Sequence, residues 1–352
     1  MKRLLLTTAL VLGSAVLFAQ NYNKGEVKRL MNFLQQPSAK GDTNAARLEI
    51  SSINSPSTWK GVTWKNGHVE TIKWDNKDLA GMLDVSGFSG LTSIDCSRNQ
   101  LTAILLTSCE AVKEVNVSRN LLTKMDLTGC LSLSNLNCYK NRLTELLLPA
   151  PTQLKKLNCS NNYFINLDVN GITTLEWLNT QGCHLESLNI DSCTNLKTLY
   201  AGYNKLGSIT MSNTPKLANV NVDNNSINTL IISNMPGLVN FYCSDNNMVT
   251  LDIMNCSSLM DVVCSYNNLT TLSLNGCDRI IYVDCSYNDL TQLNLSNRSF
   301  LQRVLCDHNQ LTMLDVSFCP SLTYVNCRVN FITDLRTAGD DNLQMVACQW
   351  NY

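Results

Sequence analysis

A motif that recurs every 21 residues is the feature that most limits what this chain of 352 residues can fold into. Its units begin at residue 91 and follow one another without a slip, giving twelve full units over 91–342 and a partial one over 343–352. A less regular unit, 69–90, precedes them. In such repeats one unit cannot bury its apolar side alone, so neighbouring units stack and share a core. The chain is therefore expected to form one stacked array over 69–352.

The pattern within a unit predicts a strand followed by a turn. With the positions of a unit numbered 1 to 21, positions 1, 4 and 11 are apolar, position 6 is Cys in nine units and position 9 is Asn in twelve. Positions 4 and 6 lie two apart, so in a strand both face the core, while positions 3 and 5 face solvent. The Asn column can satisfy backbone groups of the turns. Cys183 takes position 9 in one unit, and its turn is expected to be looser. The pattern L-x-x-L-x-C-x-x-N-x-L is that of leucine-rich repeats, with Cys in the third Leu position.

The second half of each unit has the same spacing, as in Leu269, Leu272 and Leu274 at positions 11, 14 and 16. Too few residues separate this run from the next unit for a long helix with apolar residues at helical spacing. We therefore expect short extended pieces and turns on the convex side. Proline marks the return turn at position 20 in three units: Pro215, Pro236 and Pro320.

All sixteen cysteines occupy three repeat positions: nine lie at position 6, six at position 19, and Cys183 at position 9. Position-6 residues on adjacent strands lie ~4.8 Å apart with parallel side chains, whereas a disulfide needs Cβ atoms about 3.8 Å apart. A single-file ladder also cannot give zinc four ligands. Because Val117, Ala201 and Val222 replace Cys at position 6, we interpret the cysteines as small core residues. Some disulfides and a metal ladder remain alternatives, and we predict no cofactor and no metal site.

The N-terminus has the features of an export signal. Lys2 and Arg3 precede an apolar run, 4–18, that is too short for a membrane-spanning helix, and Ala19 suits the last residue of a cleaved signal peptide. Residues 1–19 are therefore predicted to be a signal peptide. We find no other run that could cross a membrane, so we expect a periplasmic, cell-surface or secreted protein.

Residues 20–68 are predicted to be an N-terminal cap. Within it, 24–36 places Val27, Leu30, Met31 and Leu34 on one face of an amphipathic helix, and Pro37 ends that helix. The stretch STWKGVTWKNGHV, 57–69, is similar to the capping segments of leucine-rich repeat proteins.

Taken together, these motifs resemble bacterial leucine-rich repeat proteins of the internalin type. The chain is most similar to the internalin J-like branch, in which units of 21 residues carry a Cys in place of Leu. The resemblance covers 69–352. It implies a leucine-rich repeat solenoid with a parallel β-sheet on its concave face, short extended or turn segments on its convex face, and a small helical N-terminal cap. It also implies a surface or secreted binding protein, without specifying the partner.

Aromatic side chains recur at outward positions 3, 5 and 8 of the units. Tyr and Trp often anchor recognition surfaces, although Tyr also stabilises sheets through cross-strand pairs. The candidate partner-binding residues are Trp177, Tyr200, Tyr203, Tyr242, Tyr266, Tyr282, Tyr287, His308 and Tyr324. The basic residues at position 8 of the first units, Arg98, Arg119 and Lys140, are interpreted as a solvated edge.

The composition excludes several classes of function. A net charge of −1 argues against nucleic-acid binding. The three His are far apart in sequence and form no catalytic or metal-binding motif. Single acids at position 15 are interpreted as solubilising, not catalytic: Asp126, Asp168, Asp252 and Asp315.

We therefore expect an exported, non-enzymatic protein that binds a protein or glycan partner through its concave sheet. The alternative is a structural or assembly protein of the envelope that forms homo-oligomers through an open C-terminal sheet edge.

Overall fold

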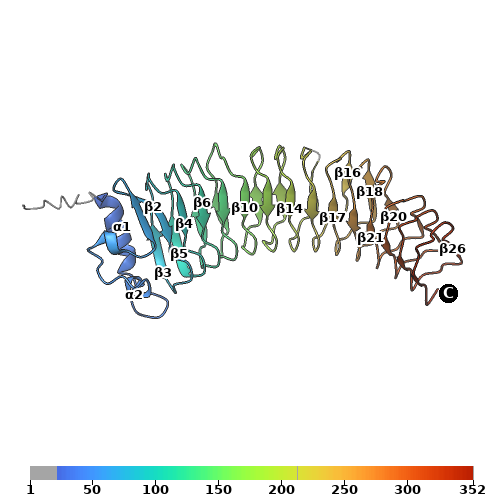
Figure 1. Cartoon of the computed structure of the whole chain (residues 1–352), viewed down its shortest axis with the longest axis horizontal. Coiled ribbons are helices and arrows are strands. Elements are labelled where there is room, and N and C mark those ends of the chain that lie inside the picture. Colours follow the sequence, from blue (N-terminus) through green and yellow to red (C-terminus); the bar gives the residue numbers. More distant parts are fainter. Residues whose placement is uncertain (1–21, 212, 352) are drawn as a thin grey trace, which may run out of the picture.

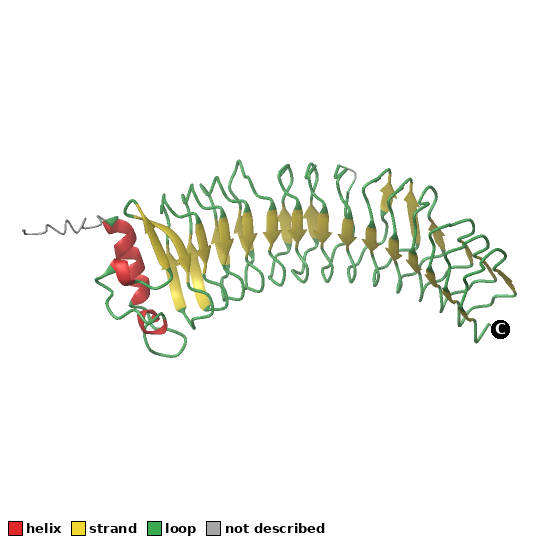
Figure 2. Cartoon of the chain, viewed as in Figure 1, coloured by secondary structure: helices red, strands yellow, loops and turns green. Residues whose placement is uncertain are grey.

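A computed structural model describes residues 22–211 and 213–351 of the chain. The repeat units stack side by side into a long curved array, and the helices gather at its N-terminal end (Figures 1 and 2). The predicted signal peptide, 1–19, lies outside the described residues. The leucine-rich repeat solenoid predicted from the sequence is confirmed.

The N-terminal cap is built on α1 (Lys24–Leu34), which ends two residues before the predicted boundary. The side chain of Asn23 accepts hydrogen bonds from the N–H groups of Gly25 and Glu26 and so begins the helix. Leu30 and Leu34 are buried as predicted, together with Phe33, which the helical pattern missed. The ring of Phe33 stacks on Trp74 at a centroid distance of 5.6 Å, which joins the cap to the first unit.

Short elements lead from the cap into the array: α2 (Asn44–Arg47), a 3-10 turn (Pro56–Thr58) and the antiparallel hairpin of β1 (Val62–Lys65) and β2 (His68–Lys73). The strand β2 then pairs in parallel with the first regular unit. The cap thereby covers the end of the core and begins the main sheet.

The main sheet has 15 strands, and each regular unit contributes one of them. After β1 and β2 its order is β4 (Ser93–Asp95), β6 (Glu114–Asn116), β8 (Asn135–Asn137), β10 (Lys156–Asn158), β12 (Trp177–Asn179), β14 (Thr198–Tyr200), β15 (Asn219–Asn221), β17 (Asn240–Tyr242), β19 (Asp261–Val263), β21 (Tyr282–Asp284), β23 (Arg303–Leu305), β25 (Tyr324–Asn326) and β27 (Met345–Ala347).

In every regular unit the strand of the main sheet covers positions 3 to 5, because the unbroken period aligns each unit with the next. Val262, for example, pairs with Val283, and both are buried. β27 pairs with β25 on one side only among the described residues. The proposed self-association through this edge stays a prediction.

The opposite side consists of turns and short strands that form separate small sheets, which confirms the predicted extended pieces. Their order is β3 (Ala80–Asp84) with β5 (Gln100–Leu105), β7 (Lys124–Asp126) with β9 (Glu145–Leu147), β11 (Asn166–Asp168) with β13 (Ser187–Asn189), β16 (Ile231–Ser233) with β18 (Thr250–Met254) and β20 (Thr271–Ser273), and β22 (Gln292–Asn294) with β24 (Met313–Asp315) and β26 (Asp334–Arg336).

The asparagine column at position 9 connects successive units as predicted. The Asn267 amide donates to the carbonyl oxygens of Cys243 at 3.0 Å and Cys264 at 3.2 Å, and its Oδ1 accepts the N–H of Met248 at 3.1 Å. Each side chain therefore satisfies buried backbone groups in two units. Cys183 makes only the donor half of this arrangement, with its thiol 3.1 Å from the Cys159 carbonyl oxygen. The looser turn predicted there stays a prediction.

Cysteines at position 19 repeat this connection on the opposite side. The Cys109 thiol donates to the Val85 carbonyl oxygen at 3.0 Å, and the same bond recurs at Cys193, whose thiol lies 3.2 Å from the carbonyl oxygen of Val169. These cysteines are therefore hydrogen-bonding residues as well as core spacers. Sequence reasoning identified only the second role.

The sixteen thiols are free, and all lie in the described part of the chain. Fifteen of them are buried, and burial raises the pKa of thiols such as Cys264 and Cys285 well above the ordinary value. Cys348 is exposed, so the prediction that every position-6 cysteine fills the core is wrong there. The reason is that no strand stacks beyond β27 within residues 22–351.

Candidate binding surface

The outward face of the main sheet carries two rows of side chains, from positions 3 and 5 of each strand. In β12, for example, Leu178 is buried while Trp177 and Asn179 on either side of it are partly exposed. The repeat places equivalent residues on neighbouring strands one strand spacing apart, ~4.8 Å. The residues at these positions therefore form continuous columns along the array.

Asparagines occupy position 5 on four successive strands, from Asn116 to Asn179. The Oδ1 of Asn137 accepts the N–H of Tyr139 at 3.2 Å, and that of Asn179 accepts the N–H of Gln181 at 3.0 Å. This local turn fixes the orientation of the amide. The Nδ2 groups of Asn137, Asn158 and Asn179 have no acceptor among the described residues. We call these three side chains the asparagine ladder.

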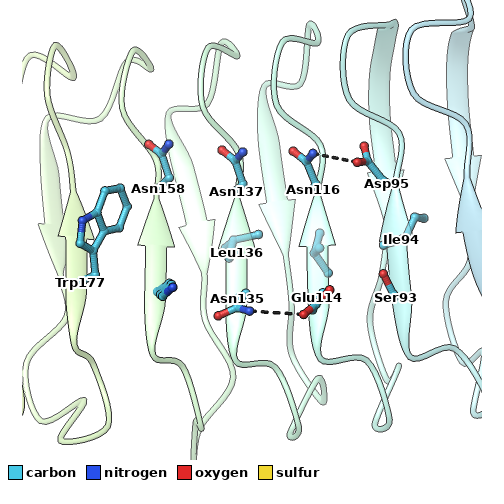
Figure 3. Close-up of a pocket in the computed structure, with 12 residues that line it drawn as sticks. Ser93, Ile94, Asp95, Glu114, Asn116, Asn135, Leu136, Asn137, Asn158 and Trp177 are labelled. Carbon is cyan, nitrogen blue, oxygen red and sulfur yellow. Dashed lines mark hydrogen bonds between the residues drawn. The ribbon is translucent and has the colours of Figure 1, made fainter.

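A groove of about 520 Å³ crosses the sheet from β4 to β12 and includes the first two residues of the ladder. Figure 3 shows Asn116, Asn137 and Asn158 in one row and Trp177 at one end of the groove. At the other end Asn116 donates to a carboxylate oxygen of Asp95 at 3.0 Å, and in the second row Asn135 donates to Glu114 at 3.5 Å (Figure 3). The groove therefore combines amide donors, carboxylate acceptors and one indole ring.

Aromatic side chains replace the asparagines farther along the same face. The indole ring of Trp177 meets the ring of Tyr200 edge-on at 6.0 Å. The Arg303 guanidinium lies 4.8 Å from the ring centre of Tyr324 and 6.0 Å from that of Tyr282. Among the described residues Arg303 has no ion pair, so these two rings hold its side chain through cation–π contacts.

Partly buried carboxylates lie among these rings. Burial raises the pKa of Asp223 and of Asp261, and neither carboxylate has a basic side chain within ion-pair distance in the described part of the chain. Burial, together with the carboxylate of Asp284, also raises the pKa of Tyr282 to about 12. Burial is likewise the main cause of the raised pKa of Tyr242, with Asp261 next. This region therefore holds negative charge that the chain itself does not neutralise.

Position 8 lies outside the sheet, in the turn that follows each strand. Tyr203, Tyr266, Tyr287 and His308 all have φ between 54° and 56°, the left-handed region. Tyr266 stacks on Tyr287 at 4.4 Å, and Tyr287 stacks on His308 at 4.1 Å. The Nδ1 of His308 is 2.9 Å from a carboxylate oxygen of Asp307. Tyr266, Tyr287 and His308 therefore form a stacked column along one edge of the sheet.

The nine predicted site residues thus fall into two groups. Those on strands of the main sheet are Trp177, Tyr200, Tyr242, Tyr282 and Tyr324. Those in the position-8 turns are Tyr203, Tyr266, Tyr287 and His308. The second group lies beside the strand face, because a left-handed residue ends the extended backbone. We call the first group, with Arg303, the aromatic surface.

Sequence reasoning left Arg303 and the asparagine ladder out of the site. Both occupy outward positions of the repeat, Arg303 at position 3 and the ladder at position 5, so the periodicity alone could have included them. What it could not give is the fixed orientation of the amides, which depends on the local turn bonds.

The acids at position 15 lie on the opposite side of the array. The Asp126 carboxylate accepts the N–H of Thr128 at 2.8 Å, and that of Asp168 accepts the N–H of Asn170 at 2.8 Å. These two carboxylates therefore stabilise the turns that follow their strands. Within 22–211 and 213–351, no group of three or more His, Cys, Asp or Glu could hold a metal ion. No helix in the same residues is long and apolar enough to cross a membrane.

Comparison with family models and with curated proteins found no match. Solved structures do match. The functional domain of InlJ from Listeria monocytogenes, which includes a cysteine ladder, has 24% identity and a TM-score of 0.53 over 74% of this chain and 54% of that one. The present chain therefore spans about half the length of that domain.

Two other matches are more complete over this chain. The internalin InlF of Listeria monocytogenes has 17% identity and a TM-score of 0.61, covering 91% of this chain and 94% of its own. The ectodomain of the receptor kinase GASSHO1 from Arabidopsis thaliana, solved with CASPARIAN STRIP INTEGRITY FACTOR 2, has 16% identity and a TM-score of 0.60, covering 92% of this chain and 47% of its own. At these identities the comparisons establish the fold, a leucine-rich repeat solenoid of the kind found in internalins.

Proposed function

We propose that this chain is an exported, non-enzymatic leucine-rich repeat protein that binds its partner, a protein or a glycan, through the outward face of the main sheet. For the part of this face between Trp177 and Tyr324 we favour a protein partner. The rings of the aromatic surface lie on β12, β14, β17, β21 and β25 of the main sheet. This position supports the choice, since large rings on a rigid sheet provide contact area at little cost in conformational entropy.

The observation that carries the proposal is the arrangement of rings and unneutralised charges on this surface. Tyr282 and Tyr324 flank a guanidinium that has no ion pair among the described residues. Asp223 and Asp261 are partly withdrawn from water and have no basic neighbour there. Charges in such positions gain stability when a partner supplies the opposite charge. The surface therefore suits a protein partner with Lys or Arg opposite the carboxylates and Asp or Glu opposite Arg303.

The known complex of a similar fold supports a binding role. The GASSHO1 ectodomain was solved in complex with CASPARIAN STRIP INTEGRITY FACTOR 2. Because the likeness lies in the fold, it supports the use of a leucine-rich repeat surface for binding and leaves the partner of this chain to be identified.

The test is a binding experiment with the purified chain and a four-residue variant of the aromatic surface, Tyr242→Ser, Tyr282→Ser, Tyr324→Ser and Arg303→Ala. A photo-crosslinking residue in place of Thr198, next to Tyr200 on the strand face, would capture proteins from host and envelope extracts. We expect a discrete crosslinked protein with the original surface and none with the variant.

A matched control changes exposed rings elsewhere, Phe300→Ser with Phe318→Ser; both rings are at least half exposed. This control should crosslink normally, and the circular dichroism spectra of all three proteins should agree. Equal capture by the four-residue variant would remove the aromatic surface from consideration. Export is tested separately, by the N-terminal sequence of the protein recovered from the cell exterior or the periplasm, which should begin at Gln20.

A further inference from the structure

We propose that the groove at the N-terminal part of the main sheet, together with the asparagine ladder that continues past it to Asn179, binds a neutral oligosaccharide. This site is separate from the proposed protein-binding function, which uses the aromatic surface; Trp177, and Tyr200 that packs on its edge, lie where the two meet. Either proposal can therefore fail without the other.

The ladder offers hydrogen-bond donors that the protein does not use. Asn137, Asn158 and Asn179 each place Oδ1 on a backbone N–H two residues on, at 3.0–3.3 Å. Their Nδ2 groups are left to face outward, one strand spacing apart. Asparagines at position 3, the other outward row, behave differently. The Nδ2 of Asn240 donates to the Oδ1 of Asn219 at 2.6 Å, so the donor of Asn240 is already used within the protein. The three free donors are held in place before any ligand arrives, which lowers the entropy lost on binding.

The rest of the groove completes a site for a hydroxylated ring compound. At one end the carboxylates of Asp95 and Glu114 have no ion pair among the described residues and can accept hydrogen bonds from hydroxyl groups. At the other end the indole of Trp177 is partly exposed, and Tyr200 packs against its edge at 6.0 Å. The flat C–H face of a sugar ring can pack on such an indole. The volume, about 520 Å³, is in the range of ligand sites.

Sugar hydroxyls suit this arrangement better than a peptide does. A hydroxyl group accepts two hydrogen bonds, donates one, and rotates to fit its neighbours. Successive hydroxyls can therefore accept from the ladder and donate to Asp95 or Glu114. An extended peptide carries an N–H for every carbonyl, and along the ladder those N–H groups would face a row of donors. A polyanion would meet two carboxylates and a single basic side chain, Lys156.

The experiment uses the purified chain and an array of neutral gluco-, manno- and N-acetylglucosamine oligosaccharides of several lengths, with sulfated oligosaccharides and random peptides on the same array. Calorimetry then measures the affinity of the neutral oligosaccharide that binds. Replacing the ladder by Ser (Asn137→Ser, Asn158→Ser and Asn179→Ser together) keeps a side-chain oxygen for each turn and removes the three donors. At about 1 kcal/mol per hydrogen bond, this should weaken binding roughly 100-fold.

Two further variants make the test specific. The control Asn219→Ser with Asn240→Ser removes amides outside the groove and should leave the affinity unchanged. Asn158→Asp distinguishes the ligand classes, because a hydroxyl can turn and donate to the new carboxylate whereas a peptide carbonyl cannot. A neutral sugar should therefore keep its affinity for Asn158→Asp within about tenfold. The proposal is overturned if no neutral oligosaccharide binds, if only sulfated sugars or peptides bind, or if the ladder variant binds as tightly as the original chain.

Discussion

Two stretches of equal length, the four units over 91–174 and the four over 217–300, share one backbone and present different surfaces. The first stretch contains eight Lys or Arg and six Asp or Glu, whereas the second contains two and seven. Three residues of the asparagine row lie in the first stretch, while Tyr242, Tyr282 and the stacked pair Tyr266 and Tyr287 lie in the second. Nevertheless, the strand lengths and register of the main sheet and the Asn column are the same in both.

The comparison shows that the scaffold and the surface use different positions of the repeat. Positions 4, 6 and 9 set the core and the turns, whereas positions 3, 5 and 8 are free to vary. The residues that hold the fold should therefore be equivalent in the two stretches, and the residues that bind should not.

The largest expected effect is in thiol reactivity, which tests whether the core is equally closed in both stretches. Burial raises the pKa of Cys138 in the first stretch and of Cys264 in the second, and both thiols are inaccessible. Under native, non-reducing conditions we expect one thiol, Cys348, to react quickly with iodoacetamide. The other fifteen should react roughly 1000-fold or more slowly, because they need local opening. Peptide mass spectrometry over time measures the rates. Fast labelling in one stretch alone would show that its core is open, and thiols that stay blocked after denaturation would reveal disulfides.

Removing a rung of the Asn column should lower stability in both stretches alike. Asn120→Ala in the first and Asn267→Ala in the second each leave three carbonyl oxygens and one N–H without their side-chain partner. We expect a loss of about 2–4 kcal/mol for either variant, measured by urea unfolding. Asn137→Ala, at an outward position, serves as the control and should lose less than about 1 kcal/mol. A loss at one rung alone would contradict the equivalence of the two stretches.

Substitution by glycine at position 8 should change the stability differently at two kinds of residue. One has a strained backbone and makes no ring contact, and the other has the same backbone but takes part in a ring stack. Arg98 and Tyr266 have nearly the same backbone, with φ of 57° and 54°. Arg98→Gly relieves the left-handed strain and should raise stability by about 0.5–1 kcal/mol. Tyr266→Gly also loses the contact with Tyr287, and a stacked pair contributes about 0.5–1.5 kcal/mol. We expect it to be neutral or slightly destabilising in thermal unfolding. An equal gain from both variants would show that the stack contributes nothing to stability.

The smallest expected effect is a pH dependence of opposite sign at two aspartates. Burial raises the pKa of Asp223 in the folded chain above its value in the unfolded chain, so ionisation of this carboxyl group lowers the free energy of unfolding. This penalty is absent below the unfolded pKa and appears as the pH rises through the folded pKa. Hydrogen bonds from Ser317 lower the pKa of Asp315, so its contribution is lost as the pH falls. From pH 4 to pH 7 the stability of Asp223→Asn relative to the original chain should therefore rise, by on the order of 1 kcal/mol or less. That of Asp315→Asn should fall as the pH rises from about 2 to about 5, where the contribution of the Asp315 carboxylate appears. The same trend in both variants would contradict this assignment.

The repeat period was enough to predict the solenoid, the buried positions and the Asn column, because each of these depends on spacing alone. The helix of the cap was also predicted, although Phe33 was not placed in its core. The turn geometry at position 8 could not be derived from spacing, because Tyr266 and Arg98 have no sequence feature that requires a positive φ. The hydrogen bonds of Cys109 and the orientation of the Asn158 amide depend on neighbours in adjacent units and on local turns, which only the folded chain defines.

The separation of the two binding surfaces is tested most directly by a single set of binding measurements with both surface variants and both ligand classes. The four-residue variant of the aromatic surface, which leaves Trp177 and Tyr200 in place, should lose the crosslinked protein partner and keep the affinity for the neutral oligosaccharide. The ladder variant with Asn137, Asn158 and Asn179 changed to Ser should lose the oligosaccharide and keep the protein partner. Loss of both ligands in either variant, with its fold intact, would show one shared surface and contradict the separation of the two regions.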